Sequence, residues 1–311
     1  MQKNAFLFAG QGAQYVGMGR DLYEAFAQSR LVFEQADEVL GFSLSRLCFT
    51  GPQEELTRTR NCQPAILTMS IAAYQAFKAN AGGDGVDVGY MAGLSLGEYS
   101  ALVAAGALSF TDALYLVRRR GEFMEEEAKK NPGRMLSIIG LGLDEVKEIC
   151  RQTKSEIANI NCPGQTVISG GIKEIDEAER LAREKGAKMA VSLEVSGAFH
   201  SSFMQGASKR LAEELGRIEI KEPAIPVVSN VTAKPGRSAS RIRDNLIRQV
   251  ASSVLWEESM RFILREGIVD YLEFGPGKVL KGLMRRIDAG VKVSNIEKKE
   301  DIQGMIAGRT A

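Results

Sequence analysis

The order of apolar and polar positions along the chain predicts strands and helices in alternation. Short apolar runs, typical of buried strands, occupy residues 4–9, 88–94, 226–229 and 269–274. Apolar residues at helical spacing predict helices over 21–40, 64–78, 99–105, 112–130, 202–216, 240–251 and 257–266. Strands that alternate with helices are typical of a mostly parallel sheet covered by helices, so the fold class is α/β.

Residues 134–195 show a different order of predicted strands and helices. Strand-like stretches occupy 134–140, 157–162, 166–169 and 188–195, and helical stretches occupy 144–153 and 173–185. The order β-α-β-β-α-β is the split, ferredoxin-like pattern. We therefore predict a small ferredoxin-like domain of residues 133–198, inserted into a large α/β domain formed by residues 1–132 and 199–311.

Composition narrows the class of protein. Lys and Arg total 40 and Asp and Glu total 39, a balance that argues against a nucleic-acid-binding protein. No window approaches the roughly 18 consecutive apolar residues of a membrane helix. The N-terminal apolar run, Ala5 to Ala9, is shorter than a secretory signal requires. We expect a cytoplasmic protein that does not contact a membrane.

Cysteine and histidine usage limits the chemistry further. The four cysteines, Cys48, Cys62, Cys150 and Cys162, form no CxxC pair and fit no zinc spacing, so we expect reduced, buried thiols and no metal. His200 is the single histidine of the chain, which excludes a multi-histidine metal site. If a neutral imidazole transfers the proton here, it is His200.

The strongest motif is G-x-S-x-G at Gly93–Gly97, between a predicted strand and a predicted helix. A serine on such a sharp turn presents its hydroxyl to the open, so Ser95 is the candidate nucleophile. The N–H of Leu96 and the start of the helix favour negative charge there, as an oxyanion needs. The alternative is a chance Gly-Ser turn.

A serine hydroxyl needs a base at neutral pH, and His200 is the only histidine that can supply it. The alternative is a histidine that serves packing alone. An α/β-hydrolase has the order serine, acid, histidine, with the histidine usually near the C-terminus, but more than 100 residues follow His200. Asp112, Asp144 and Asp176 occupy no convincing position for the acid. We predict a dyad oriented by a group other than a carboxylate.

Two further stretches have candidate roles. The loop Gly10-Gln11-Gly12 is not a dinucleotide fingerprint, because Tyr15 stands where the third glycine belongs. Either Gln11 forms part of the site wall or the loop is a plain tight turn. In Arg118-Arg119-Arg120 two arginines are expected on a solvated face, and one could point inward to bind a substrate carboxylate. Glu273–Gly277 is interpreted mainly as a structural turn.

Eight stretches together resemble the malonyl-CoA:acyl carrier protein transacylase family and, more broadly, the acyltransferase domains of fatty acid and polyketide synthases. They are FAGQGAQYVGMG (8–19), GLSLGEYSAL (93–102), RRGEFM (119–124), NINCPGQTVISG (159–170), SGAFHSSFM (196–204), PVVSNVTA (226–233), QVASSVLW (249–256) and EFGPGKVL (273–280). They follow the order of the family and span nearly the whole chain.

The resemblance implies an α/β-hydrolase-like large domain with a ferredoxin-like insertion and a site in the cleft between them. It implies that Ser95 is acylated and that His200 is its base and later the acid. The remaining implied roles are oxyanion donors at the N–H groups of Gln11 and Leu96, a malonyl clamp at Arg120, an imidazole-orienting carbonyl at Gln249, malonyl preference at Phe199, and cleft wall at Met124 and Asn161.

The chain departs from the family pattern at two places. Leu94 stands where many members have histidine before the nucleophile, and Ser253 stands where proline is frequent near QVASSVLW. The first removes a secondary polar contact that the dyad does not need. The second puts the local geometry of Gln249 in doubt.

The expected reaction is a ping-pong transfer of malonyl from malonyl-CoA to holo acyl carrier protein through a Ser95 ester. No cofactor is expected, because CoA and the carrier protein bring the phosphopantetheine, and we expect a monomer. The sequence leaves open whether the pathway makes fatty acids or polyketides. The alternatives are a serine thioesterase or esterase, and a catalytically dead module that binds the carrier protein.

Overall fold

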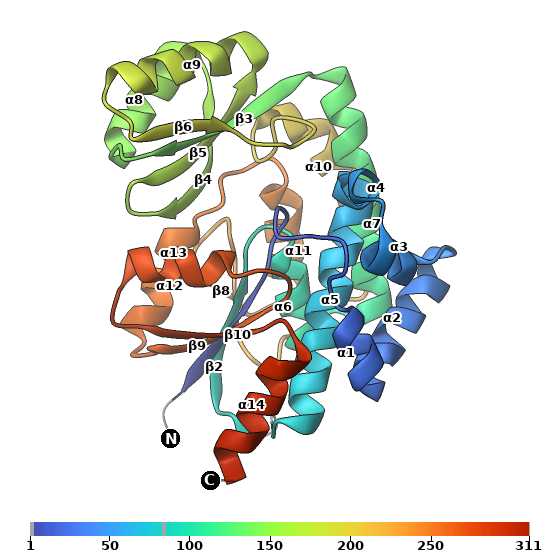
Figure 1. The fold of residues 1–311 in the computed structure, drawn as a ribbon. Helices are drawn as coiled ribbons and strands as arrows, with labels where there is room; N and C mark the ends of the chain where they lie inside the picture. The colour runs from blue at the N-terminus through green and yellow to red at the C-terminus, as the bar shows by residue number, and fades with distance from the viewer. Residues whose placement is uncertain (1–2, 83–84, 311) are drawn as a thin grey trace.

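The computed structural model describes residues 3–82 and 85–310, and within them the chain forms two separate sheets (Figure 1). The larger sheet has six strands in the order β10-β9-β1-β2-β7-β8. They are β1 (Asn4–Phe8), β2 (Val88–Gly93), β7 (Val227–Val228), β8 (Pro235–Gly236), β9 (Asp270–Phe274) and β10 (Lys292–Ile296). Every neighbouring pair is parallel except β7 and β8. The mostly parallel α/β fold predicted from the sequence is confirmed.

Strand β1 lies inside this sheet and is buried on both faces. Phe6 and Phe8 belong to one apolar core, whereas Ala5 and Leu7 belong to another, as the two-residue period of a strand requires. A parallel strand that is covered on both faces needs this continuous apolar run. The carboxyl ends of β1 and β2 are thereby fixed side by side, and the Gly10–Gly12 loop and the Ser95 turn follow directly from them.

Helices surround the large sheet (Figure 1). They are α1 (Arg20–Ala25), α2 (Ala27–Leu40), α3 (Leu44–Thr50), α4 (Gln53–Thr57), α5 (Thr59–Asn80), α6 (Gly97–Ala104), α7 (Phe110–Lys130), the 3-10 helix η2 (Ser202–Met204), α10 (Gln205–Leu215), α11 (Ala239–Gln249), α12 (Trp256–Arg265), α13 (Val279–Ile287) and α14 (Lys299–Thr310). The predicted helix 21–40 is two helices, because Phe26 has an extended backbone between α1 and α2. Helices α5 and α7 pack against each other beside the sheet.

Helix α5 begins earlier than predicted, at Thr59 instead of Pro64. Proline lacks the N–H that would bond the carbonyl of Arg60, and such a loss normally ends a helix. Here Nη1 of Arg118 on α7 donates to that carbonyl at 3.1 Å and to Oδ1 of Asn61 at 2.7 Å. Arg118 is therefore not simply a residue of a solvated face: it gives the carbonyl of Arg60 the hydrogen bond that Pro64 cannot donate.

The smaller sheet is antiparallel and carries its two helices on one side (Figure 1). Its elements are β3 (Gly133–Ile139), α8 (Leu143–Thr153), β4 (Glu156–Cys162), β5 (Gln165–Gly171), α9 (Ile172–Glu184) and β6 (Met189–Ser192), with strand order β4-β5-β3-β6. This element order and strand order are those of a ferredoxin-like sheet, as predicted. The domain boundaries at 132/133 and 198/199 stay a prediction.

The sheets meet where β4 approaches the segment after α11. The backbone N–H of Ile160 donates to the carbonyl of Val254, and the N–H of Val254 donates to the carbonyl of Ala158. Oγ of Ser253 donates to the carbonyl of Ile157 at 2.5 Å. The serine that departs from the family pattern thus helps to join the small sheet to the chain just beyond Gln249.

Candidate active site

The turn that carries Ser95 depends on two glycines. A Cβ at Gly93 would lie 1.9 Å from the carbonyl carbon of Gly97, and a Cβ at Gly97 would lie 2.2 Å from the carbonyl oxygen of Phe8. Only glycine allows β2, α6 and β1 to approach this closely. Ser95 itself has a backbone φ of 51°, a left-handed conformation that is uncommon for residues other than glycine. This strained turn presents the hydroxyl to the cavity described below, as expected for the motif.

Ser95 and His200, which are 105 positions apart in the chain, are brought into contact. Oγ of Ser95 lies 2.8 Å from Nε2 of His200, and Nδ1 of His200 lies 2.9 Å from the main-chain carbonyl of Gln249. A carbonyl can only accept, so Nδ1 carries the proton and the lone pair of Nε2 faces the serine. Among the described residues, no carboxylate bonds either ring nitrogen, and the catalytic role of this Ser-His pair stays a prediction.

The surroundings keep the imidazole neutral. His200 is almost fully buried, and burial lowers its pKa to about 4, with the Arg120 guanidinium adding to the decrease. The carbonyls of Gln249 and Ser252 act in the opposite direction but do not offset burial. A neutral imidazole at pH 7 can accept the serine proton at once.

Arg120 points inward and reaches the nucleophile. Its Nη2 donates to Oγ of Ser95 at 3.0 Å and to Oε1 of Gln249 at 3.2 Å, and its Nη1 donates to Oε1 of Gln63 at 2.8 Å. The residue is 1% exposed, and no ion pair to it occurs among the described residues. Its Nε has no hydrogen-bond partner there either. A buried guanidinium that no carboxylate contacts directly can bind an anionic group of a ligand.

Gly121 explains how Arg120 reaches this position. A Cβ at Gly121 would lie 2.7 Å from Cα of Arg60, so the glycine lets α7 approach the start of α5. That approach places Arg120 beside Gln63, whereas Arg119 ion-pairs with Glu122 outside the site.

Some backbone N–H groups near Ser95 donate a hydrogen bond within the protein, and others are available to a ligand. The N–H of Ser95 donates to Oδ1 of Asn230 at 2.6 Å, and Nδ2 of Asn230 donates to the carbonyl of Gly93 at 2.8 Å. Within the described part of the chain, the N–H groups of Leu96 and Gln11 have no acceptor. Free N–H groups at such a turn are suitable donors to an oxyanion.

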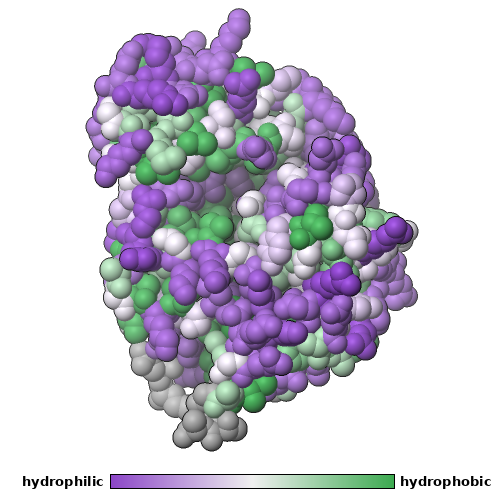
Figure 2. Space-filling model, in the orientation of Figure 1, coloured by the Kyte–Doolittle hydropathy of each residue, from purple (hydrophilic) through white to green (hydrophobic). Residues whose placement is uncertain are grey.

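A cavity of about 550 Å³ connects these groups and opens between the two sheets. Its lining includes, of the predicted residues, Gln11, Ser95, Arg120, Met124, Asn161, Phe199 and His200. Leu94, the departure before the nucleophile, also lines it, and Gln249 and Leu96 lie behind the wall as fully buried residues. Oδ1 of Asn161 has no hydrogen-bond partner among the described residues. Figure 2 shows hydrophobic side chains on both sides of the hollow.

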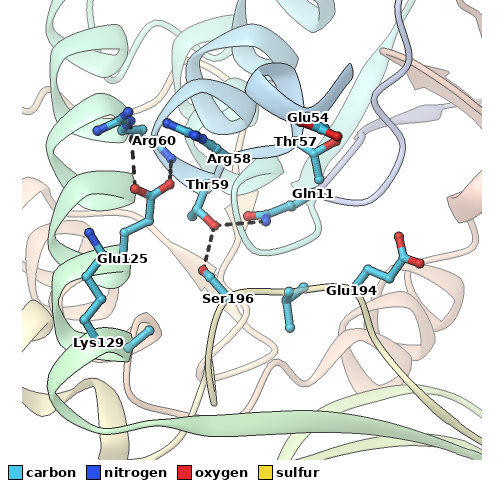
Figure 3. Close-up of a pocket in the computed structure, with 12 residues that line it drawn as sticks. Gln11, Glu54, Thr57, Arg58, Thr59, Arg60, Glu125, Lys129, Glu194 and Ser196 are labelled. Atoms are coloured by element: carbon cyan, nitrogen blue, oxygen red, sulfur yellow. Dashed lines mark hydrogen bonds and ion pairs between the residues drawn. The ribbon is translucent and has the colours of Figure 1, made fainter. Parts of the chain in front are cut away.

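A second hollow of about 520 Å³ adjoins the cavity and shares Gln11, Thr57, Glu194 and Val195 with it. In Figure 3, Gln11 and Ser196 converge on Thr59. Nε2 of Gln11 donates to Oγ1 of Thr59 at 3.4 Å, and the hydroxyls of Thr59 and Ser196 lie 3.3 Å apart. This contact joins the Gln11 loop to the chain that returns from the small sheet.

Sequence reasoning missed three buried polar residues of the site: Gln63, Glu98 and Asn230. Gln63 holds Arg120, Asn230 holds both sides of the Ser95 turn, and Glu98 accepts from Nε2 of Gln249 at 2.7 Å. Glu98 and Asn230 stand inside the motifs GLSLGEYSAL and PVVSNVTA, so the motifs contained the signal, but their partners lie far apart in the chain.

No group of three or more His, Cys, Asp or Glu in residues 3–82 and 85–310 is arranged to hold a metal ion. In those ranges no helix has both the length and the apolar character that a membrane crossing requires.

The comparisons with known proteins agree with this geometry. The sequence profile described as acyl transferase domain matches residues 5–271, and the chain belongs to this acyltransferase family. Within the family, the chain is 46% identical over 308 residues to the malonyl CoA-acyl carrier protein transacylase of Bacillus subtilis (strain 168), covering 97% of this chain and 96% of the relative. The family expected from the motifs is confirmed.

Solved structures show the same fold. The acyl-carrier-protein-S-malonyltransferase of Bartonella henselae superposes with a TM-score of 0.94 at 39% identity, with all of both chains covered. A malonyl-transacylase in complex with its type II PKS acyl-carrier protein gives a TM-score of 0.94 at 37% identity, covering 99% of this chain and 100% of that one.

Proposed function

We propose that this chain transfers the malonyl group of malonyl-CoA to the phosphopantetheine thiol of holo acyl carrier protein, through an ester on Ser95. The observation that carries the proposal is the buried Arg120 guanidinium, which has no ion-pair partner among the described residues and lies 3.0 Å from the Ser95 hydroxyl. An acyl group that ends in a carboxylate can meet the serine and the guanidinium together.

The first half-reaction begins when Nε2 of His200 takes the Ser95 proton and Oγ attacks the thioester carbonyl. The N–H groups of Leu96 and Gln11 donate to the oxyanion, and each such donor is worth about 3 kcal/mol in comparable sites. The C–S bond then breaks, His200 returns its proton to the departing CoA sulfur, and malonyl remains on Ser95. The main-chain carbonyl of Gln249 holds the imidazole throughout.

The second half-reaction runs the same steps with a different thiol. His200 takes the proton of the phosphopantetheine thiol, the sulfur attacks the ester carbonyl, and His200 returns the proton to Oγ of Ser95. Arg120 holds the carboxylate in both halves and disfavours neutral acyl groups, because acetyl leaves its charge unpaired. Phe199, Met124 and Asn161 form the wall around the acyl group, and Phe199 favours malonyl over methylmalonyl.

The reaction needs no resident cofactor, because phosphopantetheine arrives on CoA and departs on the carrier protein. The names of the relatives support both partners: one is a malonyl CoA-acyl carrier protein transacylase, and one was solved in complex with its carrier protein. The cytoplasmic location and the monomeric state stay predictions from the sequence.

The test is the intact mass of the protein after brief exposure to malonyl-CoA, with Ser95→Ala alongside. We expect a malonyl adduct that requires Ser95 and disappears on addition of holo acyl carrier protein, which gains the malonyl group. Free malonate without an adduct would instead identify a thioesterase, and unreacted malonyl-CoA would identify a module without acyltransferase activity.

A further inference from the structure

One buried carboxyl group lies at the centre of the site without touching the reacting atoms. Glu98 stands on the first turn of α6, three residues after the nucleophile, and is 3% exposed. Its Oε2 accepts from the backbone N–H of Asn230 at 3.0 Å and from Nε2 of Gln249 at 2.7 Å, and the Ser229 side chain also bonds the carboxyl group. A buried carboxyl group is costly, so this position requires a reason.

The two partners of Oε2 lead to different parts of the site. Asn230 grips the Ser95 turn through Oδ1 and Nδ2. Gln249 reaches the other two functional groups: its main-chain carbonyl accepts from Nδ1 of His200, and its Oε1 accepts from Nη2 of Arg120. Oε2 of Glu98 therefore keeps in place the two residues, Asn230 and Gln249, that position the nucleophile, the base and the anion-binding guanidinium.

We propose that Glu98 is a positioning residue for the malonyl transfer, acting as a hydrogen-bond acceptor through Oε2, which holds Asn230 and Gln249 in place. This inference rests on the proposed function for its substrate but not for its geometry. Without Oε2, the Gln249 side chain keeps only the Ser95 carbonyl at 3.0 Å as acceptor, and Arg120 loses the fixed position of the Gln249 amide.

The charge of Glu98 is not what the arrangement requires. Burial raises the pKa of Glu98 to about 7 in spite of its donors, so near neutral pH the group exists in both forms. Oε2 can accept in either form when the proton resides on the other oxygen. Both named donors converge on one oxygen, and glutamine can present its single carbonyl oxygen at the same place.

The experiment compares Glu98→Gln with Glu98→Met, which has a similar length but no acceptor oxygen. Single-turnover malonylation of Ser95 is followed against malonyl-CoA concentration, which separates the maximal rate from half-saturation. We expect Glu98→Gln to stay within about 3-fold of the parent, whereas Glu98→Met loses on the order of 10²-fold, the usual cost of a misplaced reacting group. Half-saturation should also rise in Glu98→Met, because Arg120 is displaced.

A matched control separates positioning from folding. Glu273 is another buried carboxyl group, which accepts from the N–H groups of Leu280 and Lys281 and from Asn295, and it does not line the cavity. Thermal unfolding is followed by the fluorescence of Trp256, the single tryptophan. Glu273→Met should lower the melting temperature while each folded molecule keeps the rate of the parent, in contrast to Glu98→Met.

Three outcomes overturn the proposal. They are parent-like malonylation by Glu98→Met, an equal loss in Glu98→Gln, and an equal loss per folded molecule in Glu273→Met. If the parent protein takes no malonyl group, the proposed function fails alone. The reaction of Ser95 with phenylmethylsulfonyl fluoride, which needs the serine and its base but no acyl donor, then decides the positioning role by the same comparison.

Discussion

At the scale of single residues, the Ser95 hydroxyl lies between a base and a cation. Nε2 of His200 at 2.8 Å can receive its proton, and Nη2 of Arg120 at 3.0 Å donates to the same oxygen. In this arrangement Nη2 of Arg120 already has the Ser95 hydroxyl as an acceptor. Binding of malonyl would exchange the contact with the serine for a charge-assisted contact with the carboxylate, which is stronger.

Arg120→Ala should reduce malonylation of Ser95 on the order of 10²-fold or more, because the malonyl carboxylate is left buried and unpaired. Transfer of acetyl should decline far less, since acetyl has no charge to place. Rates of Ser95 acylation by the two CoA esters measure this ratio. Arg119→Ala is the control, because Arg119 ion-pairs with Glu122 and stacks on Phe123 outside the cavity. Equal losses for both acyl groups in Arg120→Ala would remove the clamp role.

The pH dependence of acylation should report on His200. Burial lowers the pKa of His200 to about 4, so the imidazole is neutral at higher pH. The acylation rate should therefore decrease only as the pH falls through that region and stay level from about pH 6 upward. A pH profile of single-turnover malonylation measures this. An inflection near the ordinary histidine pKa of about 6.5 would contradict the buried, neutral base.

His200→Ala should abolish acylation near neutral pH, and retained acylation would reveal another base.

At the scale of elements, the site is built where the backbone at the end of β1 comes unusually close to the backbone at the end of β2. The N–H of Leu94 donates to the carbonyl of Phe8, and a Cβ at Gly10 would lie 2.5 Å from the carbonyl oxygen of Leu94. The loop after β1 and the turn after β2 are thus held in direct contact. That contact brings the N–H of Gln11 and the N–H of Leu96 to the same end of the sheet.

Gly97→Ala tests this close approach. The new Cβ would press against the carbonyl of Phe8, and such overpacking costs about 1–3 kcal/mol of unfolding free energy. We also expect malonylation to decrease, because the Ser95 turn must move. Gly282→Ala is the matched control: nothing lies within 4 Å of its Cβ, so it should stabilise α13 by about 0.5–1 kcal/mol and leave the rate unchanged. Urea unfolding and acylation assays measure both; an unchanged rate in folded Gly97→Ala would show that the turn tolerates the shift.

At the scale of the whole molecule, residues from both sheets or from the loops beside them line one cavity. Ser95, after β2, and Arg120, on α7, line the cavity from the side of the large sheet. Asn161 on β4 and Val167 on β5 line it from the side of the small sheet. Phe199 and His200, on the chain that returns from the small sheet, also line the cavity. The proposed ester on Ser95 would therefore be bordered by residues of both parts of the molecule.

The apolar pattern predicted the four inner strands of the large sheet and all four strands of the small sheet, and the motifs marked several candidate residues. Ser95 was recognisable because a glycine-flanked turn is a local feature, and His200 because it has no rival in the chain. Gln63, Glu98 and Asn230 were not predicted, since their roles come from contacts between residues more than 50 positions apart. Strands β8 and β10 and helices α3, α4, α13 and α14 were not predicted. Both strands are short and lie at the edges of the large sheet, where the apolar signal is weak.

The isolation of His200 has a practical consequence for spectroscopy. One imidazole in 311 residues gives one set of ring resonances, so its nitrogen and carbon shifts in an NMR spectrum need no assignment by mutagenesis. Those shifts report tautomer and protonation directly. The same signal can therefore be watched before, during and after the proposed acylation of Ser95, so that the proposed base is itself an intrinsic reporter of each stage of turnover.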